Sequence, residues 1–491
     1  MRLTYLGHAG FIVEARGLRI LIDPWFFPAF LGSWFPYPDN RFLLDSVLDD
    51  KFDFLYISHL HEDHFDKKFL ARFDKSIPVL LPNYRSKALG KKFVSMGFRN
   101  LIPFGHLQSK DLAQGVKATM LLDTSHKEDS GLLIECDGVR FLDLNDCNTS
   151  LAELPRNVDV LAAQYSGAMW YPVCYEYSPD VMAQKVAQVR QDLMKTLIRK
   201  CEAVEARTYI PCAGPACFLD LALARMNDRD STIFPVWEDV AEEFAGARPQ
   251  TSVIQVDPGD KLAIPDLAVS RFEGDRPSSD LAAYSERRRN EWGEFYEATQ
   301  PEIGSSDIEA YFGTLQQRNV HLAKDLDKYI RVSVDKKSWG VQLGQMAEGF
   351  VIEGEDPYPP EYVLIMSPRV LGAVLSGETG WEEALLSLRI QLHRIPDVFD
   401  SRFMGLLRYG NQPTQTLQMT AEAARTETIE RDGLRMQRFC PHAGEDLTLA
   451  TICDGVIECP RHHWRWDAET GRCLEGGSLD LRVEPLVVAQ R

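Results

Sequence analysis

The sequence predicts a mixed α/β protein that ends in a small all-β domain. Over residues 1–220, short β-branched runs such as Leu18–Ile22 alternate with turn signals and with at least one helix. Residues 221–412 are richer in charge and in helix-forming residues, which predicts a mixed α+β middle region that contributes to substrate binding or to an interface. Over residues 413–491, short strand-like runs and Gly-rich turns surround a dense group of Cys, His and Trp. We therefore expect three domains with these bounds.

Two helices can be placed from their residue patterns. Apolar residues recur at spacings of three and four between Val186 and Val204, which predicts an amphipathic helix that packs on a sheet. In the middle region, ERRRNEWGEFYEATQ is a candidate helix. Its adjacent arginines Arg287, Arg288 and Arg289 point around a helix rather than to one side, so we favour a solvated face over an anion site.

Composition excludes several classes of protein. The chain has 491 residues and a net charge of −18, the wrong sign for a protein that mainly grips nucleic acid or an anionic membrane. No apolar run reaches the roughly 18 residues of a membrane span. Arg16, Arg19 and Asp23 interrupt the first apolar runs, so we expect no signal peptide. Ten cysteines are too few for a disulfide scaffold, and we expect a cytoplasmic protein with reduced thiols.

A dense group of metal-binding side chains follows the apolar run at residues 54–57. The segment YISHLHEDHFD places His59, His61, Asp63 and His64 within six residues. Imidazoles at i and i+2 can turn to one ion, while the Asp and the last His can face a second position beside it. Metal binding is therefore favoured over a polar surface loop. Upstream, Asp23 either braces this loop by hydrogen bonding or is a plain turn residue.

Further candidate ligands lie downstream. SHKEDSGLLIE offers His126, and VRFLDLNDCN offers Asp143 and Asp146 at the end of a predicted strand. This arrangement, with the opening TYLGHAGFIVE, resembles the lactonase-like branch of the metallo-β-lactamase fold, an αββα sandwich with its metals at one sheet edge. The resemblance implies ligands for two metals: His59, His61 and His126 on one, Asp63 and His64 on the other, and Asp146 as the bridge between them.

One position of that pattern is unfilled. The family has a final histidine after the bridging Asp, but YIPCAGPACFLD, where it is expected, contains none. The sequence therefore leaves two alternatives for this site: one metal with open coordination positions, or two metals.

A second constellation lies near the C-terminus, in RFCPHAGEDLTLATICDGVIECPRHHWRWD. Cys440 and His442 form one pair, and Cys459 and His462 form the other, with 16 residues between the two pairs. Two loops that each give a thiolate and an imidazole suit a [2Fe–2S] cluster with two Cys on one iron and two His on the other, which is the Rieske pattern. A Cys₂His₂ zinc site is the alternative, but the flanking CPHAG and CPRHHW favour the Rieske cluster.

The type of Rieske domain can also be predicted. Respiratory-type Rieske proteins carry a disulfide between the two cluster loops, at positions equivalent to Glu445 and Arg461 here. Neither is a cysteine, so the domain resembles the ferredoxin and oxygenase type. Next to the predicted ligand His462, His463 is expected to face away and to serve packing or surface.

The two sites together favour iron over zinc. Zinc has no accessible redox change, whereas an oxygen-binding iron needs the single electrons that a [2Fe–2S] cluster delivers. His and carboxylate ligands with open positions are typical of non-haem iron oxygenases. We therefore predict a Rieske-fed non-haem iron monooxygenase that uses O₂, with one or two irons at the first site.

This pairing of domains is similar to the CMP-N-acetylneuraminate hydroxylase family, as are the phrases SHKEDSGLLIE, LDLNDCN, QYSGAMWYPVCYEY and CAGPACF. The resemblance implies electrons from an NAD(P)H reductase through ferredoxin or cytochrome b5, and a nucleotide-sugar-like or other small polar substrate. Tyr165, Trp170 and Tyr171 either line the substrate pocket or pack in the core.

The sequence leaves two alternatives open. One is a metal-dependent hydrolase, such as a lactonase or phosphodiesterase, with zinc at the first site and a regulatory Rieske domain. The other is a redox sensor or electron-transfer adaptor whose first site is degenerate.

Overall fold

The computed structural model describes residues 1–247, 250–344, 350–461, 463–475 and 477–486. The chain forms two compact units, and each contains segments that are distant in sequence. The first unit consists of Met1–Asp123, Glu128–Met169 and Pro179–Glu297. The second unit consists of Thr124–Lys127, Trp170–Ser178 and Ala298–Arg491. The domain bounds predicted at residues 220 and 412 stay predictions.

The first unit contains an eight-stranded sheet with the order β15-β14-β1-β2-β3-β4-β5-β6. Strands β3 to β6 run parallel, and the other neighbours are antiparallel. The strands are β1 (Arg2–Gly7), β2 (Gly10–Ala15), β3 (Leu18–Ile22), β4 (Phe54–Tyr56), β5 (Val79–Pro82), β6 (Leu101–Phe104), β14 (Lys261–Ala263) and β15 (Ala268–Ser270).

A second sheet of seven strands has the order β13-β12-β11-β10-β9-β8-β7. Strands β10 to β13 are parallel, whereas β7 to β10 form an antiparallel meander. The strands are β7 (Ser109–Ala113), β8 (Val116–Leu122), β9 (Ser130–Cys136), β10 (Val139–Asn145), β11 (Val160–Gln164), β12 (Thr208–Cys212) and β13 (Ser252–Val253).

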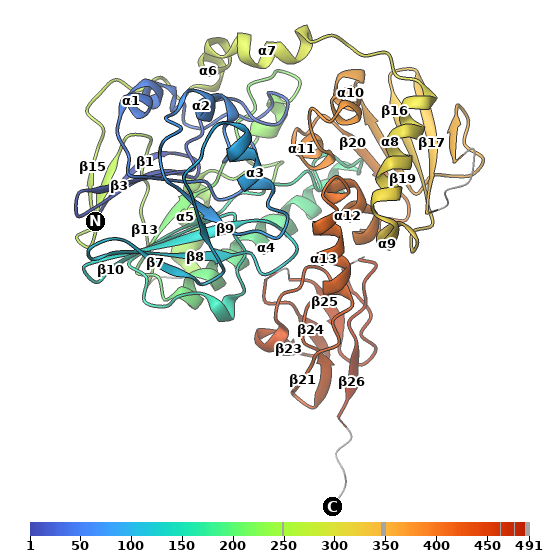
Figure 1. The fold of residues 1–491 in the computed structure, drawn as a ribbon. Helices are drawn as coiled ribbons and strands as arrows, with labels where there is room; N and C mark the ends of the chain where they lie inside the picture. Colours follow the sequence, from blue (N-terminus) through green and yellow to red (C-terminus); the bar gives the residue numbers. More distant parts are fainter. Residues whose placement is uncertain (248–249, 345–349, 462, 476, 487–491) are drawn as a thin grey trace, which may run out of the picture. The chain divides into compact units, whose positions relative to one another are not determined.

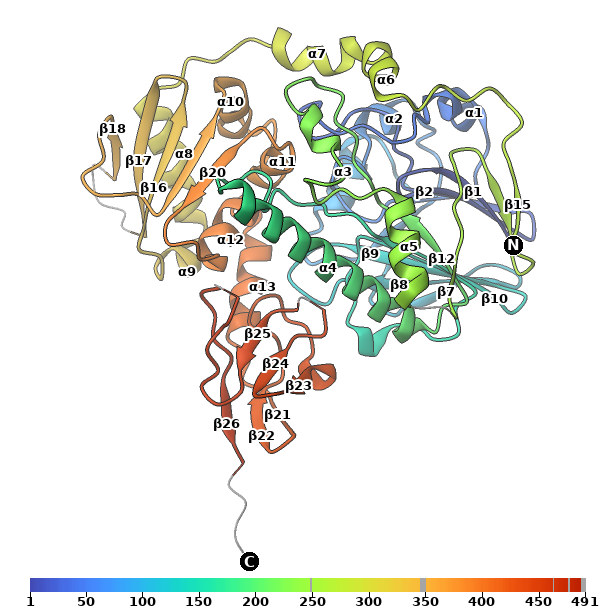
Figure 2. The same ribbon diagram turned by 180° about the vertical axis from the view of Figure 1, so that it is seen from behind.

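The two sheets bury an apolar layer between them, to which Phe11 and Ile20 of the first sheet and Ile134 and Phe141 of the second contribute. Helices cover the outer faces (Figures 1 and 2). Helices α1 (Leu44–Asp49), α2 (Lys67–Arg72) and α3 (Ala88–Ser95) pack on the first sheet, and α4 (Pro179–Val204) and α5 (Trp237–Ala247) pack on the second. This confirms the predicted αββα sandwich.

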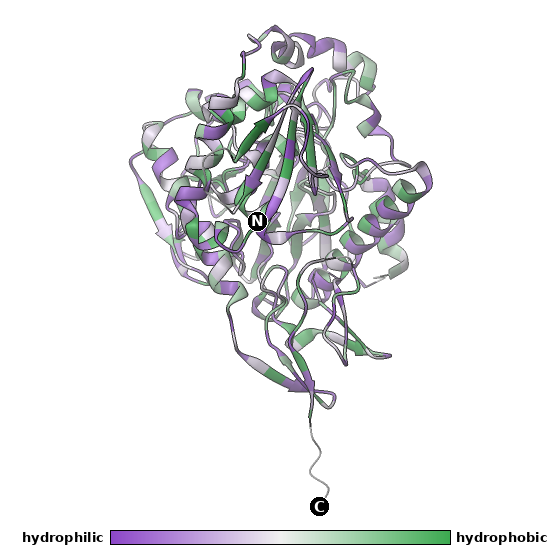
Figure 3. Ribbon diagram, turned by 90° about the vertical axis from the view of Figure 1, so that its right-hand side faces the viewer, coloured by the Kyte–Doolittle hydropathy of each residue, from purple (hydrophilic) through white to green (hydrophobic). Residues whose placement is uncertain are grey.

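The predicted helix at residues 186–204 is the C-terminal part of α4. Val186, Leu197, Cys201 and Val204 are buried, which matches the predicted apolar face. Figure 3 shows hydrophobic residues in green and hydrophilic residues in purple, and both kinds occur along the helices of the protein. Because burial of this stripe removes apolar surface from water, the outer helices are held to the sheets mainly by the hydrophobic effect.

The candidate helix around the three arginines is broken at Arg288. Helix α6 (Leu281–Arg287) ends there, and α7 (Arg289–Glu297) begins at the next residue. The Arg288 guanidinium lies 2.6 Å from the Asp39 carboxylate, and only 12% of its side chain is exposed. The solvated face that we predicted therefore holds for Arg289, whose side chain is 67% exposed, but not for Arg288.

The second unit contains a five-stranded sheet with the order β18-β17-β16-β19-β20 and a set of helices. The strands are β16 (Lys328–Val334), β17 (Lys337–Leu343), β18 (Val351–Glu353), β19 (Tyr362–Met366) and β20 (Gln391–Arg394). The helices are α8 (Ser305–Arg318), α9 (Val320–Ala323), α10 (Pro368–Ser376), α11 (Trp381–Leu386), α12 (Ser401–Tyr409) and α13 (Pro413–Ala423).

The C-terminal part of this unit is made of two three-stranded antiparallel sheets around a core of its own that includes Met436, Ile457 and Trp466. Its strands are β21 (Thr428–Arg431), β22 (Leu434–Gln437), β23 (Thr451–Cys453), β24 (Val456–Glu458), β25 (Arg465–Asp467) and β26 (Val483–Pro485). This confirms the predicted small β domain. None of the helices in the described part of the chain combines the length and apolar composition needed to cross a bilayer.

Candidate metal centres

The predicted metal-binding residues of the first unit lie where strands end. Asp23 follows β3, the loop that starts at Ser58 follows β4, and Asp146 follows β10. Strands β3 and β4 are parallel neighbours, so the residues that follow them lie at the same edge of the first sheet. Residues that leave a rigid sheet in short loops are well placed to hold functional groups at fixed positions.

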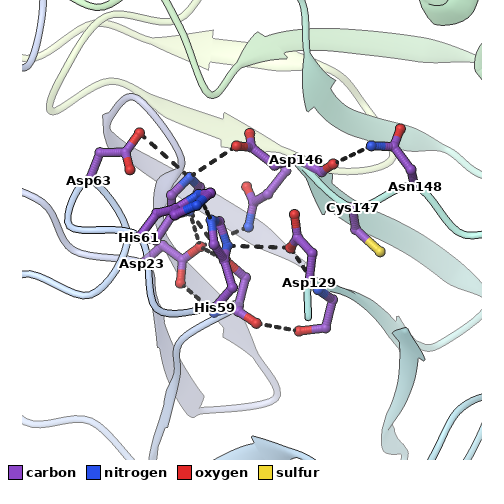
Figure 4. Close-up of polar contacts among 12 residues, drawn as sticks. Asp23, His59, His61, Asp63, Asp129, Asp146, Cys147 and Asn148 are labelled. Carbon is purple, nitrogen blue, oxygen red and sulfur yellow. Dashed lines mark hydrogen bonds and ion pairs between the residues drawn. The ribbon is translucent and has the colours of Figure 1, made fainter. Parts of the chain in front are cut away.

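One group of donor atoms combines His59, His61 and Asp146. One ligand atom from each lies within 4.8 Å of the others. The His59 Nε2 and His61 Nδ1 atoms are 2.8 Å apart, so both ring nitrogens face the same point. Figure 4 shows the two imidazoles beside Asp146. Two imidazoles and a carboxylate that converge in this way can bind a transition metal.

A second group combines His8, Asp63 and His64, again with ligand atoms within 4.8 Å of one another. His8 Nε2 lies 3.1 Å from Asp63 Oδ2. His64 Nε2 lies 3.9 Å from Asp63 Oδ2 and 3.7 Å from Asp146 Oδ2. Asp146 thus faces both groups, as a carboxylate between two neighbouring ions would.

His8 is a candidate ligand that was not predicted from the sequence. It lies in the tight turn between β1 and β2, with φ of 52°, and its ring is buried. The backbone N–H of Ala213 donates to the His8 carbonyl at 3.0 Å. Ala213 belongs to the segment in which a late histidine was expected, so this segment contacts the turn that carries His8.

Asp23 ties three loops together at this edge. Its carboxylate accepts hydrogen bonds from the Ser58 backbone N–H at 2.8 Å, from the Ser58 hydroxyl at 2.6 Å and from the Asn145 amide at 3.0 Å. It also lies 2.7 Å from His64 Nδ1. Asp129, just before β9, lies 3.3 Å from His59 Nδ1 and was not predicted. Carboxylates on the outer nitrogen orient an imidazole and fix its tautomer.

The negative charge of the buried carboxylates at this site favours the binding of a cation. The pKa of His64 is raised to about 10: burial opposes the imidazolium, but Asp63, Asp23 and Asp146 outweigh burial. The pKa of Asp63 is lowered, because His64 and His8 outweigh burial in the same way. Among the described residues, His64 Nε2, Asp63 Oδ1 and Asp146 Oδ1 are buried without a hydrogen-bond partner. Since buried polar atoms normally have partners, this donor set fits a metal ion.

Two loops of the C-terminal β domain carry the other predicted ligands. Cys440 and His442 lie in the loop after β22, and Cys459 lies in the loop after β24. His462 lies outside the described residues. Both cysteines are buried. The His442 ring stacks on Trp464, with centroids 4.2 Å apart and planes 11° apart.

The surroundings of these loops favour the protonation states in which cysteine and histidine bind iron. Burial raises the pKa of the Cys440 thiol, but contacts with Cys459, with backbone N–H groups of its loop and with the charge of Arg461 lower it overall. Burial and the nearby positive charges, including that of Arg461, lower the pKa of His442 to about 3. A thiol that ionises readily and a neutral imidazole are the forms that bind iron.

Comparison with known families matches residues 2–194 to the beta-lactamase superfamily domain and residues 425–481 to the Rieske [2Fe-2S] domain. The chain joins a metallo-β-lactamase-fold domain to a C-terminal Rieske domain. Both predicted resemblances are thereby confirmed, and the Rieske domain indicates a [2Fe–2S] cluster.

The chain is similar over its whole length to a protein of Mycolicibacterium smegmatis that bears the name Rieske 2Fe-2S iron-sulfur protein. The two are 28% identical over 545 residues, which cover 99% of this chain and 100% of the relative. Cytidine monophosphate-N-acetylneuraminic acid hydroxylase of Danio rerio is 29% identical over 226 residues, which cover 43% of this chain and 38% of that enzyme. The solved structure of CmlA, a diiron beta-hydroxylase from Streptomyces venezuelae, matches with 15% identity and a TM-score of 0.35, covering 55% of this chain and 54% of that one.

His126, predicted as a ligand in the metallo-β-lactamase-fold domain, lies in the short segment that belongs to the second unit. Its Nδ1 atom lies 3.0 Å from the Glu422 carboxylate of α13, and its backbone N–H donates to the same oxygen at 3.1 Å. Its role as a ligand stays a prediction. Asp143 is fully buried near Asp23, and burial raises the pKa of its carboxyl well above the ordinary value.

The three aromatic residues predicted for the substrate pocket lie in different surroundings. Tyr165 is buried in the apolar core between the second sheet and its helices. Trp170 and Tyr171 belong to the second unit, where the Arg408 guanidinium lies 5.2 Å from the Trp170 ring centroid and that of Arg394 lies 5.3 Å from the Tyr171 centroid. The burial of Tyr165 fits core packing, and a substrate role for any of the three stays a prediction.

Proposed function

We propose that the protein is a monooxygenase that activates O₂ at non-haem iron in its metallo-β-lactamase-fold domain, with electrons from its Rieske cluster. The observation that carries the proposal is the presence, on one chain, of a histidine and carboxylate metal site and a Rieske domain. An electron carrier has no task in hydrolysis, because zinc hydrolysis moves no electrons. The similarity of part of the chain to a hydroxylase supports the same class of reaction.

In this proposal, His59, His61 and Asp146 hold one iron, and His8, Asp63 and His64 hold the other. Asp146 serves both groups. When bound, the iron supplies the site for O₂ activation that hydroxylation of an unactivated C–H bond requires. The overall reaction converts a C–H bond and O₂ into a C–OH group and water, and it consumes two electrons and two protons.

The protein's own residues prepare the ligands for this task. The Asp23 carboxylate holds a proton on His64 Nδ1, so Nε2, which is directed toward Asp63 and Asp146, is the nitrogen that would give up its proton and bind when a metal is present. Asp129 does the same for His59 at Nδ1, so that Nε2 faces His61. Both carboxylates thereby keep the imidazoles in the tautomer that binds metal and make them more basic.

The proposed partners follow from this chemistry. When bound, the cluster would supply single-electron transfer, with ferredoxin or cytochrome b5 as the donor and an NAD(P)H reductase to reduce that donor. The substrate is a small polar molecule, and a nucleotide-sugar is the first compound class to test because of the similarity to the hydroxylase of Danio rerio.

Metal content tests the proposal directly. Anaerobically purified protein should contain two irons and two sulfides in the cluster and one or two further irons. Electron paramagnetic resonance should show the reduced cluster and a separate signal from the remaining iron. Zinc in place of the additional iron, with ester hydrolysis that does not respond to cluster reduction, would establish the hydrolase instead. Cluster iron alone after anaerobic reconstitution would establish an electron-transfer adaptor.

Variants separate the two centres. His59→Ala and Asp146→Ala should abolish O₂-dependent turnover but keep the absorbance of the Rieske cluster. Cys440→Ser and His462→Ala should remove both that absorbance and reductant-driven turnover. Product formation by cluster-free protein supplied with the natural electron donor would contradict the proposal.

The hydrolase remains the second candidate because of one observation. Two neighbouring groups of three donors, with Asp146 of one group 3.7 Å from His64 of the other, also suit a pair of metals that activates water for hydrolysis. A screen of lactones and phosphodiesters with the zinc-loaded and the iron-loaded protein distinguishes the two functions.

A further inference from the structure

A buried ion pair connects the two loops that carry the cluster ligands. Arg461, on the second loop, lies 3.2 Å from Glu445, on the first, measured from Nη1 to Oε2. The Arg461 side chain is 3% exposed and that of Glu445 is fully buried. Charged residues are seldom buried to this degree unless they are paired. These are the two positions that carry the disulfide in respiratory-type Rieske proteins.

Each loop is otherwise closed by its own backbone. In the first loop, the Cys440 N–H donates to the Glu445 carbonyl and the Gly444 N–H donates to the Cys440 carbonyl, both at 2.8 Å. In the second loop, the Cys459 N–H donates to the Trp464 carbonyl at 2.9 Å. These bonds fix the shape of each loop but do not fix one loop against the other.

Neighbouring ionic contacts stay within their own region of the chain. His463 pairs with Glu458 at 2.9 Å, at the base of the second loop. Arg438 pairs with Asp446 at 2.8 Å, at the base of the first loop, and 45% of the Arg438 side chain is exposed. The pair of Glu445 and Arg461 differs from both because it is buried and spans the two loops.

The charge of Arg461 also reaches the ligands of the opposite loop. It acts on both Cys440 and His442. Glu445, 3.2 Å from Arg461, carries the opposite charge. The reduction potential of an iron–sulfur cluster depends on the net charge close to it, because reduction adds one negative charge.

We infer that the ion pair of Glu445 and Arg461 is a positioning device that holds the two cluster loops together and sets the reduction potential of the [2Fe–2S] cluster. The inference rests on the Rieske domain alone and not on the proposed oxygenase activity, so the two can fail separately. It requires that the two residues act as a pair and that their charges act on the cluster in opposite directions.

The experiment uses the full-length holoprotein with Glu445→Gln, Arg461→Gln and both changes together. Iron and sulfide content report cluster retention, and a redox titration followed by electron paramagnetic resonance reports the potential. Arg461→Gln leaves a buried negative charge and should lower the potential, whereas Glu445→Gln leaves a positive charge and should raise it. The double variant should lie between the two. Arg438→Gln, in the exposed pair, is the matched control, and it should shift the potential less than Arg461→Gln and keep the cluster, because water screens an exposed charge.

The double variant also decides the outcome if a single change causes cluster loss. If the residues act as a pair, the double variant retains more cluster than the poorer single variant, because no uncompensated charge remains buried. Shifts of the same sign in both single variants, unchanged potentials, or a double variant that retains no more cluster than the poorer single variant would each overturn the inference.

Discussion

The imidazole of His8 lies 3.1 Å from the carboxylate of Asp63, although 55 positions separate them in the chain. The contact joins the turn between β1 and β2 to the loop after β4, which carries the dense histidine motif. It supplies an imidazole to the group of donors that otherwise consists of Asp63 and His64.

His8→Ala should therefore weaken metal binding by at least about 10-fold, because one of three donors is lost. The [2Fe–2S] absorbance should be unchanged, since the Rieske ligands lie elsewhere. Metal titration of the apo-protein, followed by iron analysis, measures the effect. His393→Ala, which removes a part-exposed histidine of β20, is the control. Equal iron content in His8→Ala and wild type would exclude His8 as a ligand.

Asp23→Asn tests the carboxylate that orients His64. An amide of the same shape loses one acceptor oxygen and brings an N–H₂ group against donors from Ser58 and Asn145. We expect metal affinity to fall by about 10–100-fold and the free energy of unfolding to fall by about 1–3 kcal/mol. Urea unfolding and metal titration measure the two effects. Asp137→Asn changes an exposed carboxylate and should alter neither.

Gly7→Ala tests the turn that presents His8. Gly7 has φ of +104°, and an added Cβ would lie 3.0 Å from the amide nitrogen of Asn40. The Asn40 amide donates to the Leu6 and Trp25 carbonyls at 2.7 and 2.8 Å, so it has little freedom to move. We expect a loss of about 1–3 kcal/mol in the free energy of unfolding together with lower iron content.

Gly17→Ala separates the contact at Gly7 from the cost of the backbone conformation. Gly17 also has positive φ, at +81°, but no atom of the described chain lies within 4 Å of the added Cβ. It should cost about 1–2 kcal/mol and leave the iron content unchanged. If the two variants lose equal stability and keep equal iron, the close approach to Asn40 has no consequence.

Arg288→Gln tests the break between α6 and α7. The substitution leaves Asp39, which is 3% exposed, without its nearest cation. We expect the free energy of unfolding to fall by about 1–3 kcal/mol. Arg289→Gln, at the neighbouring exposed position, should stay within about 0.5 kcal/mol of wild type. Chemical denaturation compares them, and equal stability of the two variants would show that the ion pair with Asp39 contributes nothing.

Local patterns made part of this structure predictable. The repeat of apolar residues over 186–204 is visible in the sequence because a helix returns to the same face every three or four residues. The motif from His59 to His64 is visible because its members are close in the chain. The sequence of the cluster loops is equally informative, since each loop carries both of its ligands.

Contacts between distant segments could not be predicted in this way. Strands β14 and β15 have three residues each, too few to show a period, yet β14 pairs with β1. His8 becomes a partner of the motif only when strands β1 to β4 assemble into one sheet, and Asp129 only when the second sheet packs on the first. The link between Glu445 and Arg461 likewise depends on how two loops fold against each other, for which spacing in the chain gives no signal.

Asp23 links amino-acid substitutions between the two sheets to the geometry of the metal site. Its carboxylate binds Ser58 beside β4 and Asn145 at the end of β10, so one side chain spans the seam between the two sheets. The same oxygen that contacts Asn145 also contacts His64. A substitution that widens the sandwich at this edge must therefore rotate an imidazole of the metal site, even when it lies far from any donor atom. For this reason, substitutions in the core and the orientation of the metal-binding imidazole are coupled through the single carboxylate of Asp23.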